Sequence, residues 1–129
     1  MKNVFLIASD PESAVNNALK NAFVSTGFDV RTMSPEKVAS RKFDSGRELQ
    51  AACVLVDCDS ENIPETSTGL LGELSRISQA FAKKTPLFAY GSNGREISEA
   101  CSEKDFHSIL ITPDNAAQTA SLIQTFIAH

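Results

Sequence analysis

The sequence lacks the long apolar segments of membrane and exported proteins. Its longest unbroken apolar run, residues 51–56, has six residues, whereas a transmembrane helix needs about 20. The apolar run near the N-terminus, residues 4–8, is too short for the core of a signal peptide. We therefore expect a cytoplasmic protein that does not bind membranes.

Cysteine and histidine are scarce and are not grouped at metal-ligand spacing. The three cysteines, Cys53, Cys58 and Cys101, include no CxxC pair, and their odd number argues against a disulfide framework. We interpret them as reduced thiols that pack in the interior. The two histidines, His107 and His129, have no partner at metal-ligand spacing and are assigned no role.

The chain also lacks a block of basic residues. It has 12 Lys and Arg against 16 Asp and Glu, which gives a formal net charge of -4. Nonspecific binding to nucleic acid needs a basic face that displaces counterions from phosphates. We therefore expect no nucleic-acid partner.

Short apolar runs alternate with helical patterns along the whole sequence, an arrangement typical of parallel strands joined by crossover helices. Strands are predicted at residues 4–8, 28–32, 53–56, 86–90 and 108–112. Helices are predicted at residues 14–23, 38–43, 70–81, 96–104 and 116–127, with a polar loop at 58–69. The predicted fold class is α/β, a flavodoxin-like (βα)₅ three-layer sandwich. Right-handed crossovers give the strand order 2-1-3-4-5 in one domain over residues 1–129.

The first predicted helix has clear start and stop signals. Asp10 provides an N-cap carboxylate, Pro11 suits the first helical position, and Gly27 suits the helix end. Asp57 directly follows the third predicted strand, which neighbours the strand that leads to Asp10. Because ligands bind open parallel sheets at the carboxyl ends of the strands, we expect both acids at the functional edge.

The sequence resembles the receiver domain of bacterial two-component response regulators over essentially its full length. The resemblance depends on the element order, on residues 2–12 (KNVFLIASDPE) and on the apolar strand that ends in Asp57. It also depends on Pro86, which opens the fourth strand, and on Thr112 and Pro113, which close the fifth. The resemblance implies the same fold and a site at the carboxyl edge of the sheet.

The resemblance also implies roles for individual residues. Asp57 matches the aspartate that takes a phosphoryl group from a histidine kinase. The family's magnesium-binding acid pair is matched by Ala8 and Ser9. The hydroxyl residue that ends the fourth strand is matched by Gly91, with Ser92 one position later. The implied pocket is therefore degenerate.

Two further family positions depart from the pattern. Thr112 stands where the family has a phosphate-binding lysine, and Ile109 stands at its aromatic switch position. Phosphoryl transfer requires neutralisation of charge on the transferred group, and Ser9 and Thr112 replace the acid and the cation that provide it. We therefore expect no cofactor. Mg²⁺ held by Asp10 and Asp57 is the weaker alternative.

The predicted function is an atypical, stand-alone receiver-like domain, a pseudo-receiver, that signals by protein contact and is not an enzyme. Asp57 then accepts hydrogen bonds from loop amides as a structural residue. The alternative is a single-domain response regulator that a histidine kinase phosphorylates on Asp57, with Asp10 and Ser92 in shifted roles. A third alternative is a flavodoxin-like enzyme or nucleotide-binding protein. It is the weakest of the three, because no Gly-rich phosphate loop follows the first strand.

The expected partner is a histidine kinase or another signalling protein. In the family such contacts use the fourth helix, the fifth strand and the fifth helix, which match residues 93–128 of this sequence. The fourth predicted helix carries Arg95, Glu96, Glu99, Glu103 and Lys104. These charges favour recognition by charge complementarity.

Overall fold

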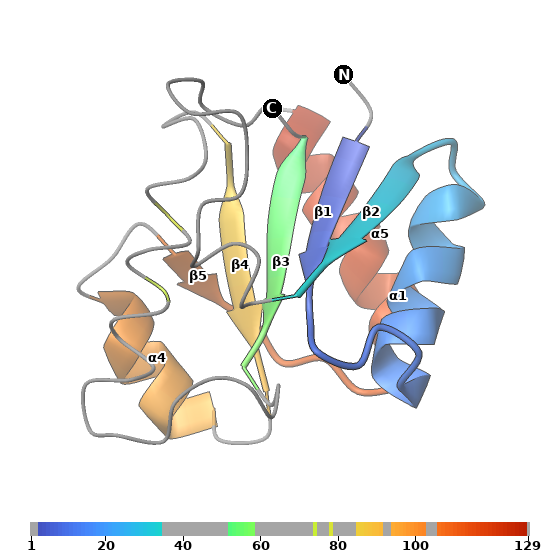
Figure 1. The fold of residues 1–129 in the computed structure, drawn as a ribbon. Helices are drawn as coiled ribbons and strands as arrows, with labels where there is room; N and C mark the ends of the chain where they lie inside the picture. Colours follow the sequence, from blue (N-terminus) through green and yellow to red (C-terminus); the bar gives the residue numbers. More distant parts are fainter. Residues whose placement is uncertain are drawn as a thin grey trace, which may run out of the picture.

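The computed structural model describes residues 3–34, 52–58, 74, 78, 85–91, 94–102 and 106–128. Five parallel strands form one sheet in the order β2-β1-β3-β4-β5 (Figure 1). The strands are β1 (Asn3–Ile7), β2 (Asp29–Met33), β3 (Cys53–Asp57), β4 (Leu87–Tyr90) and β5 (Phe106–Ser108). The helices with described bounds are α1 (Ala14–Val24), α4 (Gly94–Ser102) and α5 (Ala116–Ala128). The predicted α/β class and strand order are confirmed.

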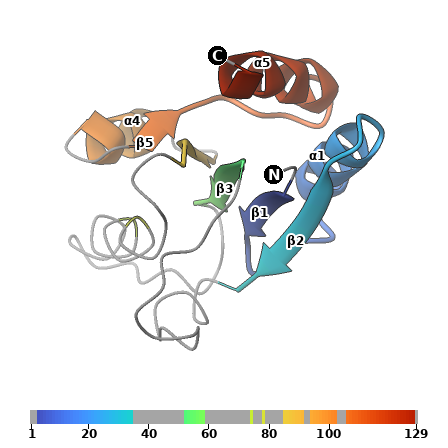
Figure 2. The same cartoon turned by 90° about the horizontal axis from the view of Figure 1, so that it is seen from above.

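The central strands are apolar throughout because both faces of the sheet are covered. One face packs against α1 and α5 through side chains that include Leu6, Leu55 and Phe23. The other face packs against α4 through residues that include Val56 and Ile97. Figure 2 shows α1 and α5 together on one side of the sheet. Successive residues of a strand point to opposite faces of the sheet, so a continuously apolar strand contributes side chains to both core clusters.

Helix α1 begins later than the sequence signals suggest. The N-cap is Ser13, whose Oγ accepts a hydrogen bond of 3.2 Å from the Asn16 backbone N–H, so the prediction of Asp10 as N-cap is wrong. Asp10 Oδ1 instead accepts from the Glu12 N–H at 3.2 Å, which makes a turn before the helix. The predicted stop is confirmed, because Gly27 has φ of 94°, a conformation that glycine adopts without strain.

The fifth strand lies earlier in the chain than predicted. The structure places β5 at Phe106–Ser108, whereas the apolar run predicted residues 108–112. The Ile109 N–H still donates to the Ala89 carbonyl at 2.9 Å, but Leu110 is 69% exposed. Asn115 captures the next backbone groups: its Nδ2 donates to the Leu110 carbonyl, and its Oδ1 accepts from the Thr112 N–H. These bonds turn the chain towards α5.

Several predicted elements lie outside the described residues. These are the helix at residues 38–43, the loop at 59–69 and most of the helix at 70–81. Of the latter, Leu74 and Ser78 are described as helical, and Leu74 is fully buried. In the described part of the chain, no helix is long and apolar enough to cross a membrane.

Candidate functional site

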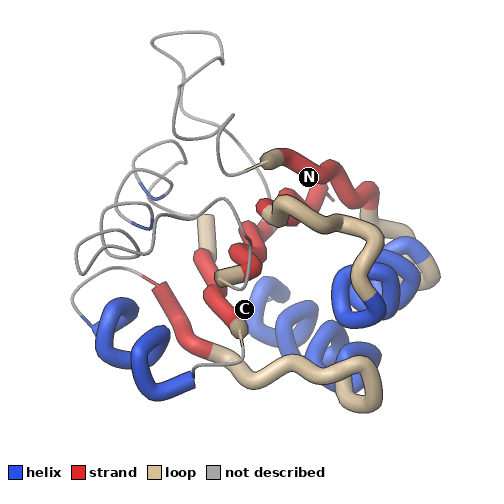
Figure 3. The backbone as a smooth tube through the Cα atoms, turned by 60° about the horizontal axis from the view of Figure 1, so that its bottom comes forward, coloured by secondary structure: helices blue, strands red, loops and turns tan. Residues whose placement is uncertain are grey.

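The carboxyl ends of the strands bring together residues that are far apart in the sequence. Asp57 ends β3 and lies in register with Tyr90, which ends β4. Ala8 follows β1, the strand on the other side of β3, and is buried, whereas Ser9 is half-buried. Figure 3 turns this lower edge of Figure 1 towards the viewer and shows the loop between β1 and α1 beside the strand ends. Asp57 therefore lies at the carboxyl edge of the sheet, as the sequence predicts.

The amide of Asn16 is the centre of this edge. Its Nδ2 donates to Asp57 Oδ2 at 3.0 Å and to the backbone carbonyl of Asp10 at 2.8 Å. Its Oδ1 accepts a hydrogen bond from the Tyr90 hydroxyl. Asn16 has no exposed surface, and both N–H groups of its amide have acceptors. This Asp57–Asn16–Tyr90 network joins α1, β3 and β4.

Asn16 and Tyr90 are not among the site residues that the sequence predicts. A signal was present for Asn16, because it occupies the same helical stripe as Leu19 and Phe23, the other buried residues of α1. A polar side chain on an apolar stripe must have a buried hydrogen-bond partner. Tyr90, the only tyrosine of the chain, gave no comparable signal within its apolar strand.

Asp10 contributes to the network through its backbone and not through its carboxylate. Its side chain is exposed and accepts from the Glu12 N–H, while its carbonyl accepts from Asn16. The neighbouring Glu12 carboxylate pairs with Lys20 Nζ at 2.9 Å, and this partner lowers the pKa of Glu12. The loop between β1 and α1 is therefore acidic on its exposed side, with its turn held by hydrogen bonds of its own.

The remaining predicted pocket residues differ in their exposure and in their contacts. Gly91 follows Tyr90 and is half-buried, and Ser92 lies outside the described residues. Thr112 is exposed, and its Oγ1 accepts from the Asn115 N–H at 3.3 Å. Thr112 therefore stabilises the turn that leads into α5.

The thiols differ in accessibility. Burial raises the pKa of Cys53 to about 12 and also raises the pKa of Cys101, so both remain protonated at neutral pH. Cys53 packs in the core cluster that faces α1 and α5, and Cys101 packs in the cluster that faces α4. Cys58, the residue after Asp57, is half-buried, and its backbone N–H donates to the Tyr90 carbonyl at 2.8 Å. This bond ties the loop after β3 to the end of β4.

The hydrogen-bond donor beside Asp57 Oδ2 and the Asp10 carbonyl disfavours a magnesium ion at these two oxygens. The Asn16 amide donates to both Asp57 Oδ2 and the Asp10 carbonyl. A cation bound to these two oxygens would face N–H groups with partial positive charge. Within the described ranges, no three His, Cys, Asp or Glu side chains are grouped so that they could hold a metal.

Comparisons with known proteins place the chain in a fold class. No protein-family model and no curated protein matches the sequence. A protein from Sinorhizobium meliloti 1021, described as a CpaE2 pilus assembly protein, has a TM-score of 0.65 at 12% identity and covers 95% of this chain and 97% of its own. A flavodoxin from the domain Archaea has a TM-score of 0.55 at 13% identity, with 100% of both chains covered. Flavodoxin 2 from Bacillus cereus has a TM-score of 0.54 at 14% identity and covers 98% of this chain and 99% of its own.

The chain is therefore an α/β protein of flavodoxin-like fold. At these identities the likeness shows the arrangement of the strands and helices alone. One neighbour is described by a role in pilus assembly and two are flavodoxins, so one fold serves different functions in these proteins. The function of this chain therefore depends on its own side chains, and the carboxyl edge of the sheet is where open parallel sheets bind ligands.

Proposed function

We propose that the chain is a cytoplasmic, non-enzymatic receiver-like domain in which Asp57 is structural and which acts by contact with a protein partner. One observation carries the proposal: Asp57 Oδ2 accepts a hydrogen bond from the buried amide of Asn16. A histidine kinase or another signalling protein is the kind of partner that the resemblance to receiver domains suggests.

The charges at the edge argue against phosphoryl transfer to Asp57. A phosphorylated side chain brings nearly two negative charges, which need a metal ion or a fixed cation beside them. The neutral Asn16 amide donates hydrogen bonds but offers no charge. Thr112, at the position where receiver domains have a lysine, is uncharged and stabilises a turn. Neither the Asn16 amide nor Thr112 supplies the positive charge that a phosphoryl group on Asp57 would need.

The network also argues for a single conformation at this edge. Asn16 links Asp57 to Tyr90 and to the loop after β1 in one set of buried and partly buried hydrogen bonds. Ile109, at the position of the family's aromatic switch, is half-buried against the core cluster between the sheet and α5. Hydrogen bonds that hold Asp57 and Tyr90 to Asn16, together with an aliphatic residue at the switch position, favour constitutive contact with a partner over a switched one.

The reading as a flavin- or nucleotide-binding protein has less support. A phosphate group at the start of α1 would need free backbone N–H groups and no negative charge. In this loop the Glu12 N–H is held by the Asp10 carboxylate, and the Asn16 N–H is held by Ser13 Oγ. The Asp10 and Glu12 carboxylates would repel a phosphate.

Intact-mass spectrometry after incubation with acetyl phosphate and Mg²⁺ tests the proposal. We expect no mass gain of one phosphoryl group, while a phosphorylatable receiver domain in the same reaction gains it. An adduct that forms on the wild type but not on Asp57→Asn would establish the phosphorylated alternative instead. A parallel titration with FMN, followed by flavin fluorescence, should show no saturable quenching.

A further inference from the structure

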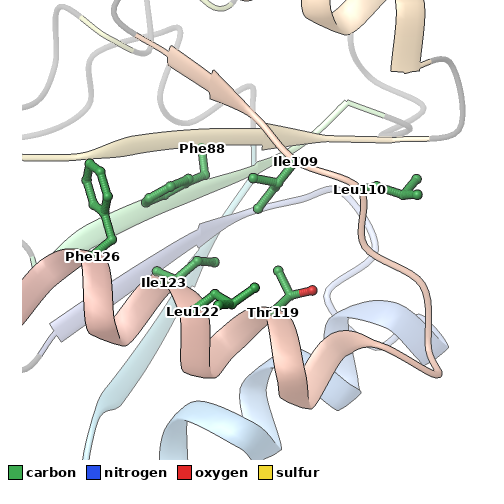
Figure 4. Close-up of a pocket in the computed structure, with 7 residues that line it drawn as sticks. All are labelled: Phe88, Ile109, Leu110, Thr119, Leu122, Ile123 and Phe126. Atoms are coloured by element: carbon green, nitrogen blue, oxygen red, sulfur yellow. The ribbon is translucent and has the colours of Figure 1, made fainter.

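The two edges of the sheet differ in their chemistry. At the β5 edge the chain leaves the sheet, and Leu110, Leu122 and Phe126 are among the residues that line an apolar groove of about 350 Å³ beside α5 (Figure 4). Apolar contact is not directional, so such a groove does not select one partner. The β2 edge is polar instead and carries charges of both signs.

Strand β2 lies at the end of the sheet opposite to β5, and in the described part of the chain its strand partner is β1 (Figures 1 and 2). One face of β2 packs towards α1 through Val30. Asp29, Arg31 and Thr32 are exposed. Within the described ranges, neither Asp29 nor Arg31 forms an ion pair. Two opposite charges on one exposed strand are therefore available to another chain.

The backbone groups of β2 point alternately towards β1 and away from it. The Met33 carbonyl accepts a hydrogen bond from the Ala8 N–H at 3.0 Å, so Met33 and Arg31 direct their backbone groups towards β1. The N–H and C=O groups of Val30 and Thr32 consequently point outward. An edge with outward backbone groups can pair with an added strand.

The charges of β2 make the strand its own complement in one antiparallel register. In a two-fold pair centred on Val30, the two copies of Val30 exchange main-chain hydrogen bonds, and Asp29 lies opposite Arg31 of the other copy on both sides of the axis. A centre one residue earlier places Asp29 opposite Asp29, and a centre one residue later places Arg31 opposite Arg31. Like charges directly opposite each other destabilise a strand pair, so the charges select the register centred on Val30.

We propose that the outer edge of β2 (Asp29–Met33) binds the same edge of a second copy of this chain, antiparallel and about a two-fold axis at Val30, to form one continuous sheet. The charges point to a second copy because the two-fold operation pairs each charge of the strand with its opposite. Main-chain bonds and exposed charge pairs hold such an interface, so the dimer is weak and sensitive to salt. The inference goes beyond the proposed function and does not depend on the chemistry of Asp57.

Arg31→Asp is the variant that tests the interface, and Arg95→Asp is its matched control. Both residues are exposed arginines, and both variants change the net charge equally, but Arg95 lies on α4, beside the opposite end of the sheet. In sedimentation-velocity experiments at low salt, the wild type and Arg95→Asp should dimerise. Arg31→Asp should raise the dissociation constant at least ~10-fold, because it places carboxylate opposite carboxylate on both sides of the axis.

Exchange of the two charges tests the register. The double variant with Asp29→Arg and Arg31→Asp again has opposite charges facing each other, so its dissociation constant should lie within roughly 3-fold of the wild-type value. Asp29→Arg alone should weaken the dimer as Arg31→Asp does. An equimolar mixture of the two single variants should form a heterodimer, because each charge then meets its opposite.

Thr32→Pro tests the strand pairing itself. It removes an outward N–H but no bond to β1, so it should weaken the dimer while the circular dichroism spectrum remains that of the folded protein. A wild type that is monomeric up to hundreds of micromolar would overturn the proposal. Equal effects of Arg31→Asp and Arg95→Asp would also overturn it, as would a monomeric double variant. The phosphorylation assay reports on Asp57 alone, so the two proposals fail separately.

Discussion

Asn16→Ala removes the centre of the network at the carboxyl edge of the sheet. The substitution deletes the donor to Asp57 and to the Asp10 carbonyl, and the acceptor of the Tyr90 hydroxyl. Asp57 is half-buried and Tyr90 is 3% exposed, so water replaces these bonds poorly. The loss should therefore appear as a lower free energy of unfolding.

The expected loss is about 3 kcal/mol. A hydrogen bond to a charged group contributes about 1.5–3 kcal/mol, and withdrawal of the acceptor from a buried hydroxyl costs about 1–3 kcal/mol. The higher helix propensity of alanine returns about 0.5 kcal/mol. Against a total stability of about 5–15 kcal/mol, the melting temperature should fall by about 10 °C.

Asn17→Ala is the matched control. Asn17 is the next residue of α1, and its Nδ2 donates to the Glu12 carbonyl at 2.9 Å in an exposed position. Because water replaces this bond, Asn17→Ala should change the free energy of unfolding by no more than about 0.5 kcal/mol. Urea unfolding followed by circular dichroism measures both variants. A difference of less than about 1 kcal/mol between the two variants would contradict the central role of Asn16 in the network.

A double-mutant cycle isolates the bond between Asn16 and Asp57. Asp57→Asn retains the shape of the side chain and removes its charge. Asn16→Ala, Asp57→Asn and the double variant should show a coupling of about 1–2 kcal/mol, because the two side chains are in direct contact. Additive effects would mean that the bond contributes nothing to stability.

Two further predictions concern charge and thiol reactivity. Asn16→Asp places a second carboxylate beside Asp57, and the repulsion between the two raises the pKa of the pair above about 4, the ordinary pKa of Asp. The free energy of unfolding of this variant should therefore fall, relative to wild type, as pH rises from 4 to 7. Mg²⁺ should raise the melting temperature of this variant and leave the wild type unchanged, and a wild-type increase would contradict the structural role of Asn16. Iodoacetamide at pH 8 should label Cys58 first, because burial raises the pKa of Cys53 to about 12 and that of Cys101 above 9.0. Peptide mass spectrometry gives the order, and labelling of Cys53 before Cys58 would contradict the prediction.

The parallel sheet could be predicted from the sequence because its signals are local. Continuous apolar strands separated by helical patterns require helices on both faces, and right-handed crossovers then leave few possible strand orders. The position of β5 could not be predicted in this way. The run at residues 109–111 is apolar enough for a strand, but the Asn115 side chain captures the backbone groups of Leu110 and Thr112.

The candidate site also has one part that could be predicted from the sequence and one part that could not. The sequence by itself determined that Asp57 ends a buried strand at the carboxyl edge of the sheet. Only the tertiary structure decided what Asp57 contacts. Its bond to Asn16 spans 41 positions of the sequence, and the bond from Tyr90 to Asn16 spans 74. A hydrogen bond forms only where packing brings donor and acceptor within about 3 Å of each other, and no periodic pattern in the sequence encodes that distance.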